Sequence, residues 1–151
     1  MTPLRPILLV EDSERDAELT LEALAENHLA NEVIHALDGA QALDFLYQKG
    51  SFAGRARELP LFVLLDLKLP KVDGLEVLRR IKSDPELKVV PVVMVTSSRE
   101  ERDLIQSYKL GVNAYVVKPV GFEQFAEVVK NLGVFWAVLN EPLPSKRPQQ
   151  S

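Results

Sequence analysis

The stretch Leu61-Phe62-Val63-Leu64-Leu65-Asp66 decides the fold, because five consecutive apolar residues end there at a carboxylate. An uninterrupted apolar run of this length predicts a strand that is buried on both faces. Such strands occur in parallel sheets whose two faces are covered by helices. The aspartate directly after the run then lies at the carboxyl end of its strand, which is where open parallel sheets bind ligands.

Four further apolar segments alternate with stretches of helical periodicity, so the chain predicts five strands and five helices. The expected strands are Ile7–Val10, Glu32–Ala36, Leu61–Leu65, Val89–Val95 and Ala114–Val117. The expected helices are Leu19–Ala25 after Ser13, Ala40–Tyr47, Leu75–Ile81, Leu104–Leu110 and the stretch from Phe122 onward. This alternation predicts an α/β fold in which a five-stranded parallel sheet is doubly wound.

The composition predicts a single domain, since 151 residues with 46% hydrophobic content can build one sizeable core. We place the domain at residues 1–140, with a C-terminal helix extension from about residue 133, and a proline-rich tail at 141–151. Residues 50–60 combine glycine, basic residues and proline, and they predict an exposed loop between the second helix and the third strand.

The C-terminal extension is too apolar for a disordered tail. Its large apolar residues are Val134, Phe135, Trp136, Val138 and Leu139. These side chains pack either on the core of their own domain or on a second copy of the chain. A symmetric homodimer is the commoner outcome for such a patch, and we expect one here.

Several classes of function are disfavoured by the composition. The 18 basic and 22 acidic residues give a net charge of -4 without a long run of one sign, so we expect no direct contact with nucleic acid. The absence of cysteine removes disulfides, thiolate metal sites and cysteine nucleophiles. The first apolar run has four residues and ends at Glu11, which is too short for a signal peptide or a membrane span. We therefore expect a cytoplasmic protein without membrane attachment.

The residues that follow the apolar runs carry the chemistry. They are Glu11 and Asp12 after the first strand, Asp66 after the third, Thr96 after the fourth and Lys118 after the fifth. If the first and third strands are neighbours, their three carboxylates repel one another unless a cation lies between them. Mg²⁺ suits oxygen ligands of this kind, with Asp12 and Asp66 as direct ligands and Glu11 acting through a bound water.

The same set of residues suits phosphoryl transfer to a carboxylate. A carboxylate attacks an anionic phosphoryl donor poorly unless charge on the transferring group is neutralised. Mg²⁺ and the Lys118 ammonium supply that neutralisation, and the Thr96 hydroxyl can donate to a phosphoryl oxygen. We expect the acyl phosphate to form on Asp66.

The chain resembles response-regulator receiver domains over about residues 6–131, on four motifs that each stand at a strand end. They are Leu-Leu-Val-Glu-Asp-Ser, Leu-Leu-Asp-Leu-Lys-Leu-Pro-Lys-Val-Asp-Gly, Val-Met-Val-Thr-Ser and Tyr-Val-Val-Lys-Pro. The resemblance implies a flavodoxin-like, receiver-type fold and a response regulator that takes its phosphoryl group from a sensor histidine kinase. It also implies that the chain is a phosphoacceptor with autophosphatase activity rather than an enzyme with a separate substrate.

Further residue roles follow only from this resemblance. It implies a switch pair, Thr96 and Tyr115, that changes the surface from about Arg99 to Lys130 when the acceptor is phosphorylated. It implies that the backbone carbonyl of Lys68 completes the Mg²⁺ shell and that the Lys118-Pro119 bond is cis. The long loop at 50–60 and the Phe135–Pro144 ending look like those of the regulators paired with phytochrome kinases, which makes a bacteriophytochrome a candidate partner.

Each motif taken alone has a structural explanation. Ser13 followed by Asp16 resembles a capping box, residues 96–98 could cap a helix, and Lys118 could be an ordinary turn residue. Four such coincidences at four correct strand ends are improbable, so the functional interpretation is favoured.

Two alternative classes use a similar aspartate. A hydrolase of the haloacid dehalogenase kind needs an acid two residues after its nucleophile, and Lys68 occupies that position here. A degenerate receiver that serves only as a docking scaffold would lack reactive groups that this chain retains. A P-loop protein is excluded, because no glycine-rich loop precedes a Lys-Ser or Lys-Thr pair.

Overall fold

The computed structural model describes residues 5–27, 31–54, 58–119 and 121–131, which contain five strands and five α-helices as predicted. In chain order the elements are β1 (Ile7–Val10), α1 (Glu14–Glu26), β2 (Val33–Ala36), α2 (Gly39–Tyr47), the 3₁₀ helix η1 (Gly50–Phe52), β3 (Val63–Leu65), α3 (Gly74–Ser83), β4 (Val92–Thr96), α4 (Glu101–Lys109), β5 (Ala114–Val117) and α5 (Phe122–Asn131). The predicted extension and tail beyond residue 131 lie outside the described residues.

The five strands form one parallel sheet in the order β2-β1-β3-β4-β5. The strand order reverses between β1 and β3, which pair in parallel with Val10 opposite Leu65. The expectation that the first and third strands are neighbours is therefore confirmed, and the topological switch point lies between them. A doubly wound sheet of this kind binds its ligands at that point, beyond the carboxyl ends of the strands.

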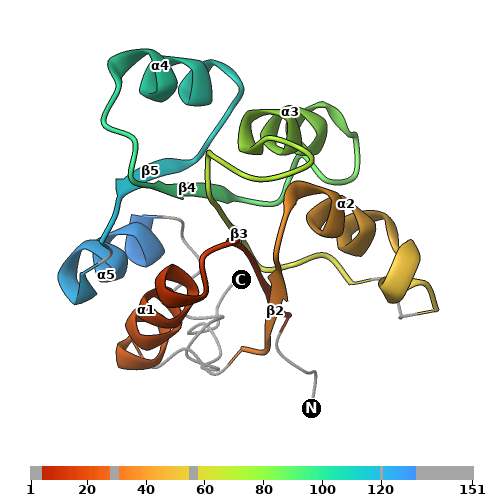
Figure 1. Cartoon of the computed structure of the whole chain (residues 1–151), viewed down its shortest axis with the longest axis horizontal. Helices are drawn as coiled ribbons and strands as arrows, with labels where there is room; N and C mark the ends of the chain where they lie inside the picture. Colours follow the sequence, from red (N-terminus) through yellow and green to blue (C-terminus); the bar gives the residue numbers. More distant parts are fainter. Residues whose placement is uncertain (1–4, 28–30, 55–57, 120, 132–151) are drawn as a thin grey trace, which may run out of the picture.

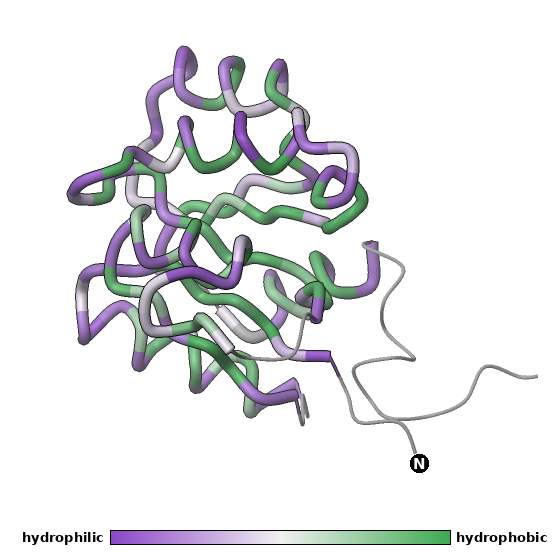
Figure 2. The backbone as a smooth tube through the Cα atoms, turned by 90° about the vertical axis from the view of Figure 1, so that its right-hand side faces the viewer, coloured by the Kyte–Doolittle hydropathy of each residue, from purple (hydrophilic) through white to green (hydrophobic). Residues whose placement is uncertain are grey.

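Helices cover both faces of the sheet, with α1 and α5 on one side and α2, α3 and α4 on the other (Figure 1). Alternate residues of the strands belong to two separate core clusters: Leu8 and Val10 pack with α2 and α3, whereas Ile7 and Leu9 pack with α1 and α5. Figure 2 shows the same arrangement, with hydrophobic strands inside and helices of mixed hydropathy outside. The strands are uniformly apolar because both of their faces are buried.

Several element boundaries differ from the predicted ones, and two of these differences have a visible structural cause. Val89 was expected in the fourth strand, but it is 70% exposed and the strand begins at Val92. A turn causes the difference, because the Asp84 side chain accepts hydrogen bonds from two backbone N–H groups that follow it and its carbonyl accepts from Lys88. The loop predicted at 50–60 contains η1, and its Phe52 ring packs edge-on against Phe45 at 5.2 Å.

The turn after β3 approaches α3 so closely that the helix must begin with a glycine. The Gly74 N–H donates to the Leu67 carbonyl at 3.0 Å. A Cβ atom at Gly74 would overlap the Asp66 carbonyl oxygen and lie 2.7 Å from that of Leu67. Both neighbours are backbone atoms, so they cannot rotate away. The position of the Asp66 backbone therefore depends on a residue without a Cβ atom at position 74.

We predict that Gly74→Ala lowers the free energy of unfolding by roughly 2 kcal/mol or more, because the added methyl group must displace backbone next to Asp66. Denaturant unfolding followed by circular dichroism measures the change. Gly121→Ala is the matched control, because a Cβ atom there meets nothing within 4 Å. Equal stability of the two variants would contradict the close approach.

Candidate functional site

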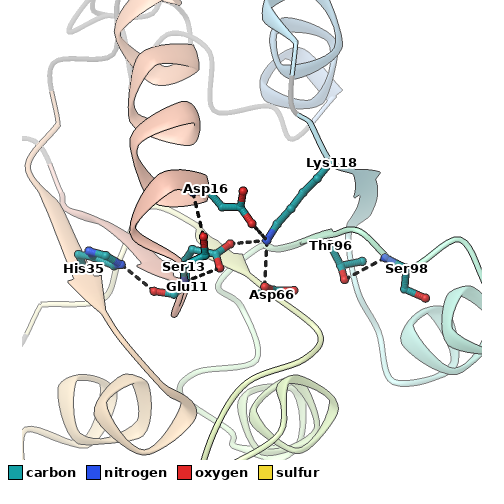
Figure 3. A network of polar contacts seen from close by, with 8 residues as sticks. All are labelled: Glu11, Ser13, Asp16, His35, Asp66, Thr96, Ser98 and Lys118. Atoms are coloured by element: carbon teal, nitrogen blue, oxygen red, sulfur yellow. Dashed lines mark hydrogen bonds and ion pairs between the residues drawn. The ribbon is translucent and has the colours of Figure 1, made fainter.

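The carboxyl ends of four strands bring the predicted site residues together at one edge of the sheet (Figure 3). Glu11 and Asp12 follow β1, Asp66 follows β3, Thr96 ends β4 and Lys118 follows β5. Neighbouring parallel strands place these residues side by side although up to 107 positions separate them in the sequence. The register between β1 and β3 sets Glu11 beside Asp66, since the Asp66 N–H donates to the Val10 carbonyl at 3.1 Å.

Three carboxylates form a cluster that can hold a cation. One oxygen from each of Glu11, Asp12 and Asp66 lies within 4.8 Å of the others. Glu11 and Asp66 are 2% and 7% exposed, whereas Asp12 is open to solvent. Carboxylates this close repel one another, and a set of oxygen donors with an exposed side fits a hard divalent cation. The role predicted for the Lys68 carbonyl stays a prediction.

The Lys118 ammonium lies between three carboxylates. Its Nζ is 2.6 Å from Glu11 Oε1, 2.9 Å from Asp16 Oδ2 and 3.0 Å from Asp66 Oδ2. Burial disfavours the charged amine, but the hydrogen bonds to the carboxylates outweigh it and raise the pKa of Lys118 above its usual range. Lys118 therefore carries a full positive charge at neutral pH, directly beside Asp66. The Lys118-Pro119 bond is cis, as the resemblance implied.

Glu11 is held from several directions. Its Oε2 accepts a hydrogen bond from the Ser13 N–H at 3.1 Å, and its carbonyl lies 2.8 Å from His35 Nε2. Burial raises the pKa of Glu11 to about 7, aided by the charge on Asp66 and opposed by hydrogen bonds from Lys118 and Ser13. His35 lies on the neighbouring strand β2, and its ring contacts the backbone carbonyl of Glu11. No pattern in the sequence predicted this contact.

Thr96 is fully buried at the end of β4, and a chain of contacts leads from it into the next loop. Its Oγ1 accepts from the Ser98 N–H at 3.3 Å, and the Ser98 carbonyl accepts from the Tyr115 hydroxyl at 3.2 Å. The Ser98 hydroxyl donates to buried Asp103 of α4 at 2.6 Å. The predicted switch pair, Thr96 and Tyr115, is therefore connected through Ser98, which the sequence indicated only as part of a possible helix cap.

Asp16 belongs to the site, although its spacing after Ser13 indicated only a helix cap. The cap exists, because the Ser13 hydroxyl accepts from the Asp16 N–H at 3.2 Å. The side chain has a separate partner, Lys118, which is 102 residues away. The sequence could have indicated this role in one way: α1 begins directly after β1, so its first turn lies at the same edge of the sheet as the predicted site.

Comparison with known proteins identifies the family. The response regulator receiver domain family matches residues 7–130. Response regulator Rcp1 of Synechocystis sp. is 43% identical over 134 residues, covering 89% of this chain and 90% of Rcp1. The solved structure of the bacteriophytochrome response regulator AtBRR is 62% identical, with a TM-score of 0.83, and covers 93% of this chain and 100% of that one. The chain belongs to the response regulator receiver family, the phosphorelay proteins of two-component signalling.

Two solved relatives bear on the chemistry of the site. Rcp1 has been solved in a Mn²⁺-bound form that is 42% identical, with a TM-score of 0.73, and covers 93% of this chain and 99% of that one. A phosphorylated cyanobacterial phytochrome response regulator, RcpA, is 44% identical with a TM-score of 0.74, and covers 94% of this chain and 99% of that one.

Within the described ranges, no helix of this chain is both long and apolar enough to span a bilayer.

We predict that the affinity for divalent cations rises between about pH 6 and pH 8, with protons released on binding. The carboxyl of Glu11, with its pKa of about 7, is partly protonated at neutral pH. A nearby dication favours the charged form, so binding lowers the pKa and expels the proton. Lys118 stays charged over this range and contributes no proton.

Calorimetric titration with Mn²⁺ in buffers of different ionisation enthalpy counts the released protons. Glu11→Gln is the control, because its amide has no proton to lose in this range. A wild-type affinity that does not change with pH would contradict the assignment of the proton to Glu11.

Proposed function

We propose that Asp66 accepts a phosphoryl group from the phosphohistidine of a sensor kinase. The observation that carries this proposal is the surroundings of Asp66, a nearly buried carboxylate between the Lys118 ammonium and two further carboxylates. An Asp66 oxygen attacks phosphorus, the P–N bond breaks, and the imidazole nitrogen of the kinase leaves with the electron pair. The product is an acyl phosphate on Asp66.

The residues around Asp66 would each lower the barrier by positioning or by charge. Lys118 offsets the negative charge of the phosphoryl oxygens. Mg²⁺, held by Asp12 and Asp66 with Glu11 acting through water and the Lys68 carbonyl completing the shell, supplies the remaining charge neutralisation. This donor set consists of oxygens, and the relative Rcp1 binds the chemically similar ion Mn²⁺.

The switch would start at Thr96. In the present state the Thr96 hydroxyl oxygen accepts from the Ser98 N–H, whereas phosphoryl oxygens on Asp66 would offer the hydroxyl proton a charged acceptor. Movement of Thr96 toward Asp66 would then shift the loop that bonds Tyr115 and Asp103. Two populations of the α4, β5 and α5 surface would follow, one for each state of Asp66.

The acyl phosphate would be hydrolysed by the chain itself, which makes the protein a phosphoacceptor with autophosphatase activity. Lys68 and Ser98 stand two positions beyond Asp66 and Thr96, where they can shield or orient the attacking water. Lys68 is exposed and Ser98 half-buried, so both are within reach of solvent. These two residues would tune the lifetime of the phosphorylated state.

The kinase partner would be a bacteriophytochrome in the cytoplasm. AtBRR, 62% identical to this chain, is a bacteriophytochrome response regulator by its name. RcpA is likewise described as a phytochrome response regulator. Similarity at this level over nearly the whole chain supports the same class of kinase here, and the signal would pass through protein contacts rather than through direct binding of nucleic acid.

We predict that acetyl phosphate with Mg²⁺ phosphorylates the wild type and leaves Asp66→Asn unmodified, since the amide is not a nucleophile. Intact-mass spectrometry detects the addition of one phosphoryl group, HPO₃, as a mass increase of about 80 Da. A phosphorylated bacteriophytochrome kinase should transfer its label to the wild type and not to this variant. Phosphorylation of the Asp66→Asn variant would show that another residue is the phosphoryl acceptor.

A homodimer is the second part of the proposal, and it depends on residues 132–151. Their sequence carries the large apolar side chains Phe135, Trp136 and Leu139, which a monomer would expose unless they fold back on its core. We predict that deletion of residues 134–151 converts a dimer into a monomer. Light scattering coupled to size-exclusion chromatography measures the mass, and an unchanged oligomeric state would reject this interface.

A further inference from the structure

Asp16 differs from the other carboxylates that contact Lys118. It comes from the first turn of α1 rather than from a strand end, and its side chain is 34% exposed. It also lies outside the cluster of Glu11, Asp12 and Asp66 that can hold a cation. Among the described ion-pair partners of Lys118, Asp16 is thus the one whose oxygens are not shared with that cluster.

Glu11 and Asp66, the other two partners of Lys118, would interact with both the ammonium and a bound cation. A dication in the cluster would be held by the same carboxylates that now bond to Nζ, directly or through water, and its charge would repel the ammonium at short range. Lys118 would then be held less strongly by Glu11 and Asp66, whose negative charge the cation would partly neutralise. An ammonium without a partner at this half-buried position would be costly, so it would either resist the cation or turn away into solvent.

We propose that Asp16 is a positioning residue that retains the Lys118 ammonium at the site when a divalent cation occupies the neighbouring carboxylates. Held in this way, Nζ stays within reach of a phosphoryl group on Asp66. The inference rests on the proposed function, in which that cation and that phosphoryl group take part. Asp16 itself contacts neither of them and acts through Lys118.

The backbone around Asp16 is suited to this task. Its N–H is bonded to the Ser13 hydroxyl at the cap, and Ser13 in turn donates from its own N–H to Glu11. Asp16 is the third residue of the 13-residue helix α1, so its backbone is fixed relative to the end of β1. Figure 3 shows the short Asp16 side chain pointing from α1 to the tip of Lys118. A short side chain on a rigid turn holds its partner at little cost in entropy.

An ordinary explanation for Asp16 is that an acid in the first turn of a helix favours the N-terminal end of the dipole. Glu14 tests this explanation directly, because it is the other acidic residue in the first turn of α1 and it is exposed. Glu14→Gln removes the same charge from the same turn without touching Lys118. Asp16→Asn keeps the size of the side chain, and Asp16→Glu keeps its charge.

The experiment measures Mg²⁺ affinity of the unphosphorylated protein by calorimetry and the rate of phosphorylation by acetyl phosphate at saturating Mg²⁺. We expect Asp16→Asn to weaken Mg²⁺ binding about fivefold, because Lys118 then competes harder for Glu11 and Asp66, and to slow phosphorylation by about as much. Glu14→Gln should change both quantities less than about twofold. Asp16→Glu should recover most of the wild-type rate.

Equal effects of Asp16→Asn and Glu14→Gln would overturn the proposal, since Asp16 would then act only as a surface charge. Unchanged or tighter Mg²⁺ binding by Asp16→Asn would overturn it as well. Thermal unfolding of each variant separates these results from a loss of folded protein. Failure of the proposed function has a different signature, in which phosphorylation of the wild type does not depend on Asp66 whatever Asp16 does to cation binding.

Discussion

The site depends on one electrostatic constraint, the placement of two nearly buried carboxylates side by side with a lysine ammonium between them. Glu11 and Asp66 stand at the ends of adjacent strands, where their mutual repulsion would be severe without a positive partner. Lys118 provides that partner from β5, reaching past β4 with its long side chain. The same repulsion that Lys118 relieves in this state would also favour a dication among these carboxylates.

The packing of the sheet gives this electrostatic arrangement its geometry. Residues on opposite faces of β1 and β3 are locked into two different core clusters, so neither strand can slide without disrupting both. The turn after β3 is pressed against the start of α3, where Gly74 leaves room for the Asp66 carbonyl. A rigid scaffold of this kind holds charged groups at distances that free side chains would not keep.

A chain of hydrogen bonds connects this edge of the sheet to α4 and β5. Thr96 contacts Ser98, and Ser98 contacts both Tyr115 of β5 and Asp103 of α4. Buried Thr96 is therefore linked by hydrogen bonds to two elements that are partly exposed. The aromatic side chain of Tyr115 is half-buried against the core cluster on the α2 and α3 side, so its position is coupled to packing as well as to hydrogen bonding.

The sequence alone determined the order of the elements, the parallel sheet and the identity of the residues at its carboxyl edge. These follow from local rules, since an apolar run of residues such as Leu61–Leu65 can be satisfied only by burial on both faces, and the charged residue after it must leave the core. Only the tertiary structure decided which charged groups meet. Asp16 and His35 carry no pattern that points to Lys118 or to the carbonyl of Glu11, because both contacts join segments far apart in the chain. The start of β4 was likewise set by the turn at Asp84 rather than by the hydrophobicity of Val89. Periodicity reports how each segment is buried, whereas contacts between segments depend on how the folded sheet brings their ends together.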